Sequence, residues 1–253
     1  MGIYALTGGA TGIGAAIKAR LEAKGHRVIM VDLKDADITA DLATAKGRAT
    51  AVEGIKAAAP EGLNGLITSA GVGSHIPDHR LITNVNYFGT VKVVEELVDL
   101  VALKKGSIVL LSSNSAPMST SEHYVDLLLE GNETAALDES DKIGGHEAYS
   151  GSKKAVARWM RRNAPAFARR GVTINAIAPG YTETPMTKVV SDDPQYGESI
   201  KRFKESIPIG RAGEPKDIAA LVDFLVGGES GFICGSVVFI DGGHDAMLRA
   251  DEF

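Results

Sequence analysis

Tyr149 and Lys153 stand four residues apart in the stretch HEAYSGSKK, residues 146–154. An α-helix completes a turn in about 3.6 residues, so on a helix both side chains would lie on one face. A cation near a phenol favours the phenolate, and a phenolate can exchange a proton with a substrate hydroxyl. The same spacing also occurs in helices that are merely amphipathic, so the rest of the chain must decide between chemistry and packing.

A glycine-rich stretch, LTGGATGIGAAI, places Gly8, Gly12 and Gly14 between an expected strand at 3–7 and an expected helix at 13–24. Glycines allow a sharp turn and the close approach of a pyrophosphate, while the helix N-terminus offers N–H groups and a positive dipole end to the anion. The alternative is a tight turn between strand and helix without a ligand. The strand before and the helix after favour a dinucleotide-phosphate site.

Asp32 ends the second expected strand, residues 27–32. Its carboxylate can accept hydrogen bonds from the adenosine ribose hydroxyls, and it would repel a 2′-phosphate. Thr11 stands in the loop where a basic residue could bind that phosphate, Leu33 follows the aspartate, and the nearby Lys34 is expected to be solvated. These residues favour NAD over NADP as the cofactor.

The elements that must position these residues alternate along the chain. Further strands are expected at 37–40, 63–71, 106–113, 172–180 and 236–243, and further helices at 42–59, 82–104, 147–169 and 214–226. Strands separated by helices of this length indicate a parallel sheet with helices on both faces. We therefore expect a single α/β domain over residues 1–253, a Rossmann-type doubly wound sheet of about seven strands.

Residues 117–145 interrupt this alternation. STSE at 119–122 resembles a capping box that would open a helix through HYVDLLLEG, and an acidic and then glycine-rich stretch follows. The segment is either an ordinary surface insertion or a lid or interface element, and the sequence leaves both open.

Composition excludes several classes of function. A net charge of −5 gives no footprint for nucleic acid or for an anionic membrane, and no apolar run approaches the about 18 residues of a membrane span. The single cysteine, Cys234, fits a reducing compartment and is expected to be a small buried residue. His75 and His79 flank a proline in an expected loop, so no metal site is expected. The chain is expected to be cytoplasmic.

With this loop and YSGSK in one chain, the sequence resembles the short-chain dehydrogenase/reductase family. The matching stretches occur in the family's order and span nearly the whole chain: TGGATGIG (7–14), SAG (69–71), NVNYFG (84–89), SIVLLSS (107–113), YSGSK (149–153) and APGYTETP (178–185). The resemblance implies an oxidoreductase that uses a nicotinamide cofactor.

The resemblance implies a catalytic tetrad of Asn86, Ser113, Tyr149 and Lys153. Tyr149 would be the general acid and base, and Lys153, with the positive nicotinamide, would lower its pKa from about 10 and bind the nicotinamide ribose. Ser113, which matches the family position better than Ser112, would orient the substrate oxygen. Ser113 and Tyr149 are thus the expected substrate contacts, and Asn86 would hold a water that relays protons from Lys153.

The expected cofactor contacts, besides Tyr149 and Lys153, follow the same motifs. They are Gly8, Thr11, Gly12, Ile13 and Gly14 in the loop, Asp32 and Leu33, Asp41 and Leu42 beside the adenine, Ala70 and Gly71 beside its ribose, and Pro179, Gly180, Thr182 and Thr184 beside the nicotinamide carboxamide.

Two departures from the family pattern stand out. Thr68 and Ser69 replace two asparagines, which weakens a structural hydrogen bond. Ser113 and Tyr149 are also unusually far apart in sequence, so the tetrad requires residues 117–145 to loop out. Tyr4, Tyr124 and Tyr196 need no catalytic role.

Within the family the chain resembles the bacterial 3α-hydroxysteroid dehydrogenase/carbonyl reductases. The signals are the short connection between the second and third strands, the insertion, YGESI at 196–200 and IDGGHDAMLR at 240–249. The resemblance implies interconversion of 3α-hydroxysteroids and 3-oxosteroids, with some carbonyl reductase activity. A bulky fused-ring substrate needs a covered apolar cleft, and residues from about 185 to 207 are expected to form a lid over it.

Three points stay open. The substrate could instead be another secondary alcohol or another hydroxysteroid position, and the chain could be a non-catalytic dinucleotide-binding regulator. A homodimer is expected, because the insertion would obstruct the long-helix surface through which relatives form tetramers.

Overall fold

The computed structural model describes residues 1–193 and 197–252. Within them, seven parallel strands form one sheet in the order β3-β2-β1-β4-β5-β6-β7. The strands are β1 Ile3–Thr7, β2 Arg27–Asp32, β3 Ile38–Thr39, β4 Gly65–Thr68, β5 Ser107–Leu111, β6 Thr173–Pro179 and β7 Val237–Ile240. The predicted doubly wound parallel sheet is confirmed, with β3 reduced to two residues.

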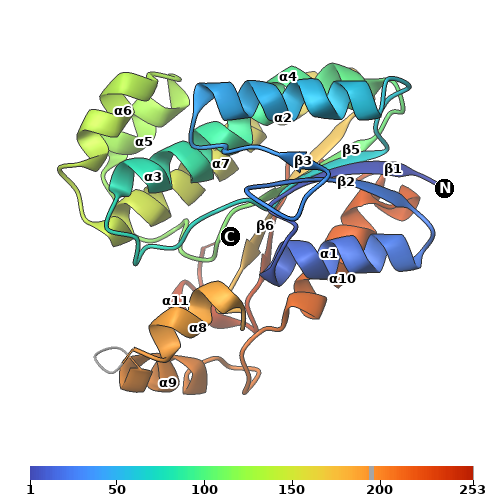
Figure 1. Cartoon of the computed structure of the whole chain (residues 1–253). Helices are drawn as coiled ribbons and strands as arrows, with labels where there is room; N and C mark the ends of the chain where they lie inside the picture. Colours follow the sequence, from blue (N-terminus) through green and yellow to red (C-terminus); the bar gives the residue numbers. More distant parts are fainter. Residues whose placement is uncertain (194–196, 253) are drawn as a thin grey trace.

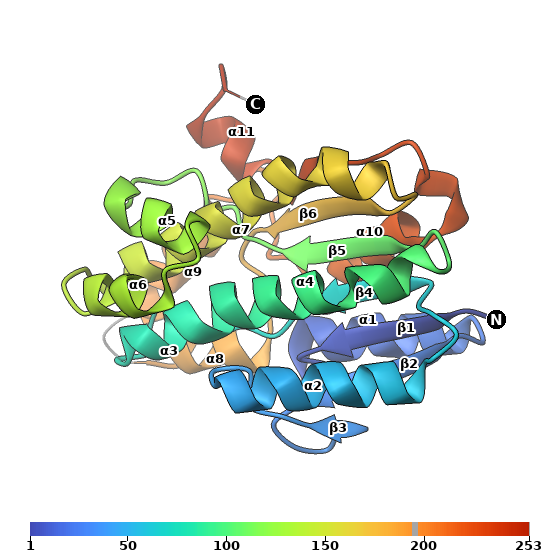
Figure 2. The ribbon, with the colours of Figure 1, turned by 90° about the horizontal axis from the view of Figure 1, so that it is seen from above.

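Helices cover both faces of the sheet (Figure 1). α1 (Gly12–Ala23) and α10 (Pro215–Val226) share one face, where Asp223 pairs with Arg20 at 2.8 Å and with Lys24 at 2.6 Å. α2 (Ala45–Ala58), α4 (Gly89–Ala102) and α7 (Gly145–Ala168) cover the other (Figure 2). Each face buries its own apolar cluster, so both sides of β1 and β4 are covered.

The strand order reverses between β1 and β4, whose register pairs Thr7 with Thr68. Gly8 follows β1 there with a φ of +73°, and a Cβ on it would lie 2.5 Å from the backbone nitrogen of Ala70. Only glycine allows so close an approach in this conformation. Ligands of such sheets bind beyond the carboxyl ends of the strands at this reversal.

The helix expected at 82–104 consists of three pieces. α3 (His79–Thr83) passes into a π-helical turn, Asn84–Phe88, and then into α4. The apolar periodicity of the sequence did not reveal the extra residue that a π turn inserts. Such turns are frequent at functional sites, and this one carries Asn86.

The insertion forms α5 (Glu122–Leu129) and α6 (Glu133–Ser140). The predicted capping box is wrong. Ser121 rather than Ser119 is the N-cap, since its Oγ accepts from the N–H of Tyr124 at 3.2 Å, and Glu122 is the first helical residue. The helix begins after the predicted position because the residue before its N-cap is bound to α7: Thr120 Oγ1 donates to the carbonyl of Glu147 at 2.9 Å.

The insertion is packed against the body of the protein. α5 and α6 lie beside α3 and α7 in both views (Figures 1 and 2). Val125 and Leu128 are fully buried, and the buried Arg48 of α2 pairs with Glu133 at 2.8 Å. The segment is therefore anchored to both α7 and α2.

The region of the expected lid contains α8 (Pro185–Ser191) and α9 (Gly197–Glu205), neither of which buries a residue. Near them in Figure 1 lies α11 (His244–Leu248), and a short 3₁₀ turn, Gly228–Ser230, follows α10. Tyr196, and with it the first residue of YGESI, lies outside the described residues. No helix in the described part of the chain is long and apolar enough to cross a membrane.

Candidate active site

Tyr149 and Lys153 lie on one face of α7, with Lys153 Nζ 5.8 Å from the centre of the Tyr149 ring. α7 begins after Gly144, whose N–H donates to Glu147 Oε2 at 3.4 Å. The motif therefore occupies the first turns of the helix, beside the carboxyl end of the sheet.

Lys153 is buried, with 5% of its surface exposed. Its Nζ donates to the carbonyl oxygen of Leu111, at the end of β5, at 2.9 Å. Burial lowers the pKa of the ammonium to about 8. Ser112 Oγ donates to the carbonyl of Lys153 at 2.9 Å, which holds α7 against β5. Sequence reasoning missed the Leu111 contact, because a backbone carbonyl has no residue-type signature.

Ser113, not Ser112, is the serine that acts on the phenol of Tyr149, whose pKa it lowers. Ser113 Oγ also accepts from the backbone N–H and the hydroxyl of Ser115, at 3.1 and 3.0 Å. These bonds fix the orientation of the Ser113 hydroxyl. The preference for Ser113 over Ser112 agrees with this geometry.

The pKa of Tyr149 differs from the expectation. Tyr149 is only half-buried, yet the protein packed around its phenol raises its pKa, and the hydrogen bond from Ser113 acts in the opposite direction. The ammonium of Lys153 is bonded to the Leu111 carbonyl. In the protein alone, burial therefore outweighs the effect of Ser113 on the pKa of Tyr149.

Asn86 is fully buried in the π turn. Its Oδ1 accepts from the N–H of Val72 at 2.8 Å, and its Nδ2 donates to the carbonyl of Val72 at 3.0 Å. A Cβ built on Gly71 would lie 3.2 Å from Asn86 Oδ1 and 3.6 Å from Lys153 Nζ. The two polar groups thus face one point beside Gly71.

The glycine-rich loop meets the conditions for an anion site. Gly12 has a φ of +58°, and a Cβ on Gly14 would lie 1.9 Å from the carbonyl oxygen of Gly8. α1 begins at Gly12, and its N-cap Thr11 makes no side-chain capping bond. The N–H groups of the first turn, which include that of Ile13, remain available to a phosphate.

Asp32 connects this loop to the end of β2. Its Oδ2 accepts from the N–H of Ala10 at 2.9 Å, and its Oδ1 accepts from the N–H of Leu33 at 2.7 Å. A carboxylate has about four acceptor positions, so it can also accept from two ribose hydroxyls. The side chain of Leu33 is exposed beside it.

The residues expected near the adenine and its ribose differ in how accessible they are to a ligand. Asp41 is exposed, and its Oδ1 accepts from the N–H of Ala43 at 3.0 Å. Leu42 is buried in the core, so only its backbone could contact a ligand. Ala70 is half-buried at the strand reversal. Thr68 Oγ1 is buried without a partner among the described residues, which agrees with the expected loss of a structural hydrogen bond.

The segment after β6 lies close to the glycine-rich loop. A Cβ on Gly12 would lie 3.4 Å from the Thr184 side chain. Thr184 Oγ1 caps α8 by accepting from Thr187 N–H at 3.2 Å, and Thr182 Oγ1 donates to the carbonyl of Gly180 at 3.1 Å. Pro179 ends β6 just before them. The loop, Asp32 and this segment together form a cradle whose residues fit a dinucleotide.

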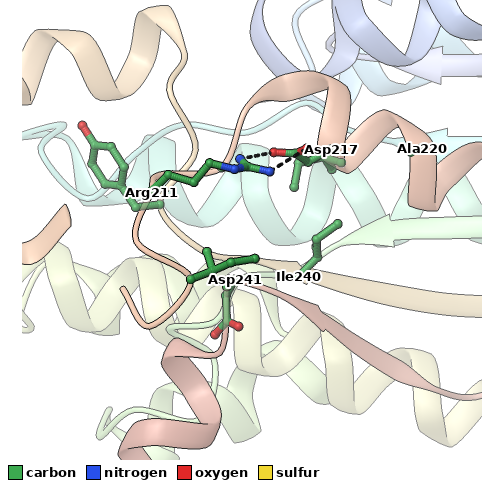
Figure 3. Close-up of a pocket in the computed structure, with 10 residues that line it drawn as sticks. Arg211, Asp217, Ala220, Ile240 and Asp241 are labelled. Atoms are coloured by element: carbon green, nitrogen blue, oxygen red, sulfur yellow. Dashed lines mark hydrogen bonds and ion pairs between the residues drawn. The ribbon is translucent and has the colours of Figure 1, made fainter. Parts of the chain in front are cut away.

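A pocket of about 330 Å³ lies nearby, where the ends of β6 and β7 meet α10 (Figure 3). Arg211 pairs with Asp217 at its rim at 2.6 Å, and Tyr181, Ile240 and Asp241 also line it. None of the four tetrad residues lines this pocket, so it is separate from the Tyr149 site.

Comparisons with known proteins agree with the geometry. Residues 3–125 match the model of the short chain dehydrogenase family, and residues 134–245 match a family model described as enoyl-(acyl carrier protein) reductase. The chain is 38% identical to the 3-alpha-hydroxysteroid dehydrogenase/carbonyl reductase of Comamonas testosteroni, over the full length of both chains.

A further relative and a solved structure are also similar to the chain over nearly its whole length. The galactitol 2-dehydrogenase (L-tagatose-forming) of Cereibacter sphaeroides is 28% identical, with 95% of this chain and 93% of that protein covered. Among solved structures, the 3-alpha-hydroxysteroid dehydrogenase from Pseudomonas sp. B-0831, complexed with NADH, superposes with a TM-score of 0.95. It is 40% identical, with 99% of this chain and 100% of that one covered.

Proposed function

The chain belongs to the short-chain dehydrogenase family, and from that premise we propose that it is an NAD-dependent oxidoreductase that interconverts 3α-hydroxysteroids and 3-oxosteroids. The observation that carries the chemistry is the position of Tyr149, which shares one face of α7 with the buried Lys153 and whose phenol is influenced by Ser113. The substrate class is supported by the names of two full-length relatives at 38% and 40% identity. Carbonyl reductase activity is expected for the same reason.

Each tetrad residue has a separate task in this proposal. NAD, when bound, supplies the hydride acceptor and donor and a positive nicotinamide ring. Tyr149 takes the proton from the substrate hydroxyl during oxidation and returns it during reduction. Ser113 donates a hydrogen bond that orients the substrate oxygen and stabilises charge on it. Lys153 and Asn86 face the point beside Gly71 through which a water could relay the proton to solvent.

The preference for NAD over NADP rests on Asp32. Its carboxylate stands at the end of β2 and already binds the N–H of Ala10 in the glycine-rich loop. A 2′-phosphate placed there would meet a negative charge instead of the arginine or lysine it needs. Lys34, two positions further on, is exposed.

A steroid requires an apolar cleft, and the C-terminal third of the chain supplies apolar side chains for it. Met186 and Val189 on α8 and Met247 and Leu248 on α11 are among the exposed large hydrophobic side chains of the protein. Beyond the carboxyl ends of the strands, α9 contacts α8, and the ring of Phe203 on α9 lies 4.7 Å from that of His244 on α11 (Figure 1). We propose that residues 185–207 act as the substrate lid.

Another secondary alcohol is the main alternative substrate. The similarity to a galactitol 2-dehydrogenase shows that relatives of this length act on quite different alcohols. A non-catalytic regulator remains the remote alternative; all four tetrad positions are filled here, whereas such regulators often lack the tyrosine or the lysine.

The test is the formation of NADH, followed by its absorbance, with NAD or NADP and androsterone as the 3α substrate. Its 3β epimer and the variant Tyr149→Phe serve as controls. We expect turnover of the 3α epimer with NAD that is lost in the variant. If NADH binds and no steroid is turned over, the substrate assignment fails while the dehydrogenase assignment stands.

We also propose that the protein is a homodimer. α5 lies directly on α7, and Glu122 pairs with Lys154 and Arg158 of that helix at 3.1 and 2.5 Å. Assembly through α7 would have to displace the insertion, so a dimer would use another face. Light scattering at several protein concentrations tests this, and a tetramer would contradict it.

A further inference from the structure

The side chain of Tyr124 lies between two segments that carry site residues. Tyr124 belongs to α5 and is fully buried. Its Oη lies 2.7 Å from Oγ1 of Thr83, the last residue of α3. Its ring lies against α7, because a Cβ built on Gly151 would be 2.8 Å from its Cδ1 atom. One side chain of the insertion therefore contacts both α3 and α7.

The direction of the hydrogen bond follows from the number of protons. Thr83 Oγ1 donates to the carbonyl of His79 at 2.9 Å, and a hydroxyl has a single proton. The hydroxyl of Tyr124 is therefore the donor to Thr83. Both residues are fully buried, so loss of this bond would leave a polar group without a partner and away from water. The bond thus fixes the end of α3 relative to α5.

Both residues that Tyr124 contacts, Gly151 and Thr83, are close in the chain to residues of the proposed tetrad. Gly151 stands midway between Tyr149 and Lys153 on α7. Thr83 directly precedes the π turn that carries Asn86. A shift of either contact would therefore move Asn86 relative to the two α7 residues.

That relative position matters because Asn86 Oδ1 and Lys153 Nζ face the same point beside Gly71. Asn86 is bonded to the backbone of Val72 through both ends of its amide, so the π turn and the Val72 loop move as a unit. A displacement of a fraction of an ångström is enough to alter a proton-transfer geometry.

We propose that Tyr124 is a positioning residue, which through Thr83 and Gly151 holds the π turn of Asn86 in register with Tyr149 and Lys153. The inference rests on the proposed function. It assigns a role to a tyrosine for which the sequence indicated none. It also gives the insertion a task beyond covering α7: the insertion sets the spacing between the π turn that carries Asn86 and the helix that carries Tyr149 and Lys153.

The kinetic test uses the variants Tyr124→Phe and Thr83→Val, their double variant, and the conservative Thr83→Ser. We expect kcat to fall roughly three- to tenfold in the Phe and Val variants, as the loss of one buried hydrogen bond implies, with the Kd for NADH unchanged. The double variant should be no slower than either single variant, because both remove the same bond. Thr83→Ser keeps the hydroxyl and should keep the wild-type kcat.

Tyr4→Phe is the matched control, since Tyr4 is another buried tyrosine, on β1, and its variant should keep the wild-type kcat. Thermal unfolding identifies any variant that does not fold. If Tyr124→Phe does not fold, the comparison of kcat between Thr83→Val and Thr83→Ser decides the proposal. A Thr83→Ser variant as slow as Thr83→Val, or additive losses in the double variant, would overturn the proposal.

Amide hydrogen exchange separates this inference from the proposed function. In Thr83→Val, the amides of residues 84–88 should exchange about tenfold faster than in wild type, while those of Thr83→Ser and the amides of β1 stay unchanged. If wild type turns over no steroid, the proposed function fails and this comparison still decides the positioning role. Equal exchange in all three proteins would overturn it.

Discussion

The ammonium of Lys153 donates to the carbonyl oxygen of Leu111 at 2.9 Å, inside the protein, and its Nζ lies 5.8 Å from the centre of the Tyr149 ring. The backbone of β5 thus binds the charged side chain of the proposed tetrad, that of Lys153. The arrangement is unfavourable for stability, because a charged group has been removed from water with one neutral acceptor as its partner. This is a typical cost of an active site.

We expect Lys153→Met to be inactive but more stable than wild type at pH 7. Burial lowers the pKa of Lys153 from 10.5 to about 8, which corresponds to a cost of about 3 kcal/mol at neutral pH. Lys153→Met removes this cost, but it also leaves the Leu111 carbonyl without its donor. That loss destabilises the variant by about 1–3 kcal/mol and offsets part of the gain. The net effect should raise Tm by about 2–4 °C, measured by thermal unfolding.

The pH dependence gives the sign of this effect. Above pH 8 the folded protein binds fewer protons than the unfolded chain, so the wild type gains stability up to about pH 10.5. The advantage of Lys153→Met should therefore shrink between pH 8 and pH 10. Lys46→Met, at an exposed lysine, is the control, and an equal Tm difference at both pH values would argue against the buried charge.

Tyr149 should titrate differently with and without NAD⁺. Burial raises the pKa of its phenol above 10 in the protein alone, and the positive nicotinamide should lower it. The difference in tyrosinate absorbance between wild type and Tyr149→Phe measures this directly. We expect a midpoint above 10 without NAD⁺ and a lower one with it; the same midpoint in both would show that the cofactor charge does not reach the phenol.

Asp32→Ser should shift the cofactor preference toward NADP. The change removes both the acceptor for the ribose hydroxyls and the charge that repels a 2′-phosphate, so we expect kcat/KM with NAD to fall by about 10- to 100-fold. Part of the loss will come from the loop, because Ala10 loses its acceptor. Asp35→Asn is the control: Asp35 is exposed with a φ of +52°, a conformation that asparagine tolerates. A ratio of NAD to NADP activity that stays constant in Asp32→Ser would contradict the role of the carboxylate.

Gly14→Ala should abolish NADH binding or prevent folding. The added methyl would lie 1.9 Å from the Gly8 carbonyl oxygen, so α1 would have to move away from β1. Gly228→Ala is the matched control, because a Cβ there has nothing within 4 Å. NADH fluorescence titration and far-UV circular dichroism distinguish loss of binding from loss of fold, and tight binding in Gly14→Ala would contradict the close approach.

The sequence predicted the sheet because its signals were local and periodic. Short apolar runs between helical patterns located every strand, and the spacing of Tyr149 and Lys153 located one face of α7. The glycines of the loop were visible because only glycine tolerates their conformations and contacts.

What the sequence could not predict depends on tertiary contacts. The π turn of Asn86 and the Leu111 carbonyl have no residue-type signal. The raised pKa of Tyr149 results from packing around the phenol, which no spacing rule contains. The capping box failed because Thr120 is bonded to the carbonyl of Glu147 on α7, a contact between distant parts of the chain.

The pairing of α1 with α10 also has a consequence for biosynthesis. Arg20 and Asp223 are 203 positions apart, so at about 5–20 residues per second the ribosome needs roughly 10–40 seconds to supply the partner of the first helix. Until then Ile17 and Leu21, which are buried in the finished protein, lack the part of their cover that α10 supplies. We expect nascent chains that end before residue 215 to be cut readily by proteases within α1, and chains extended beyond 226 to resist. α1 is thus synthesised well before the helix that completes its cover.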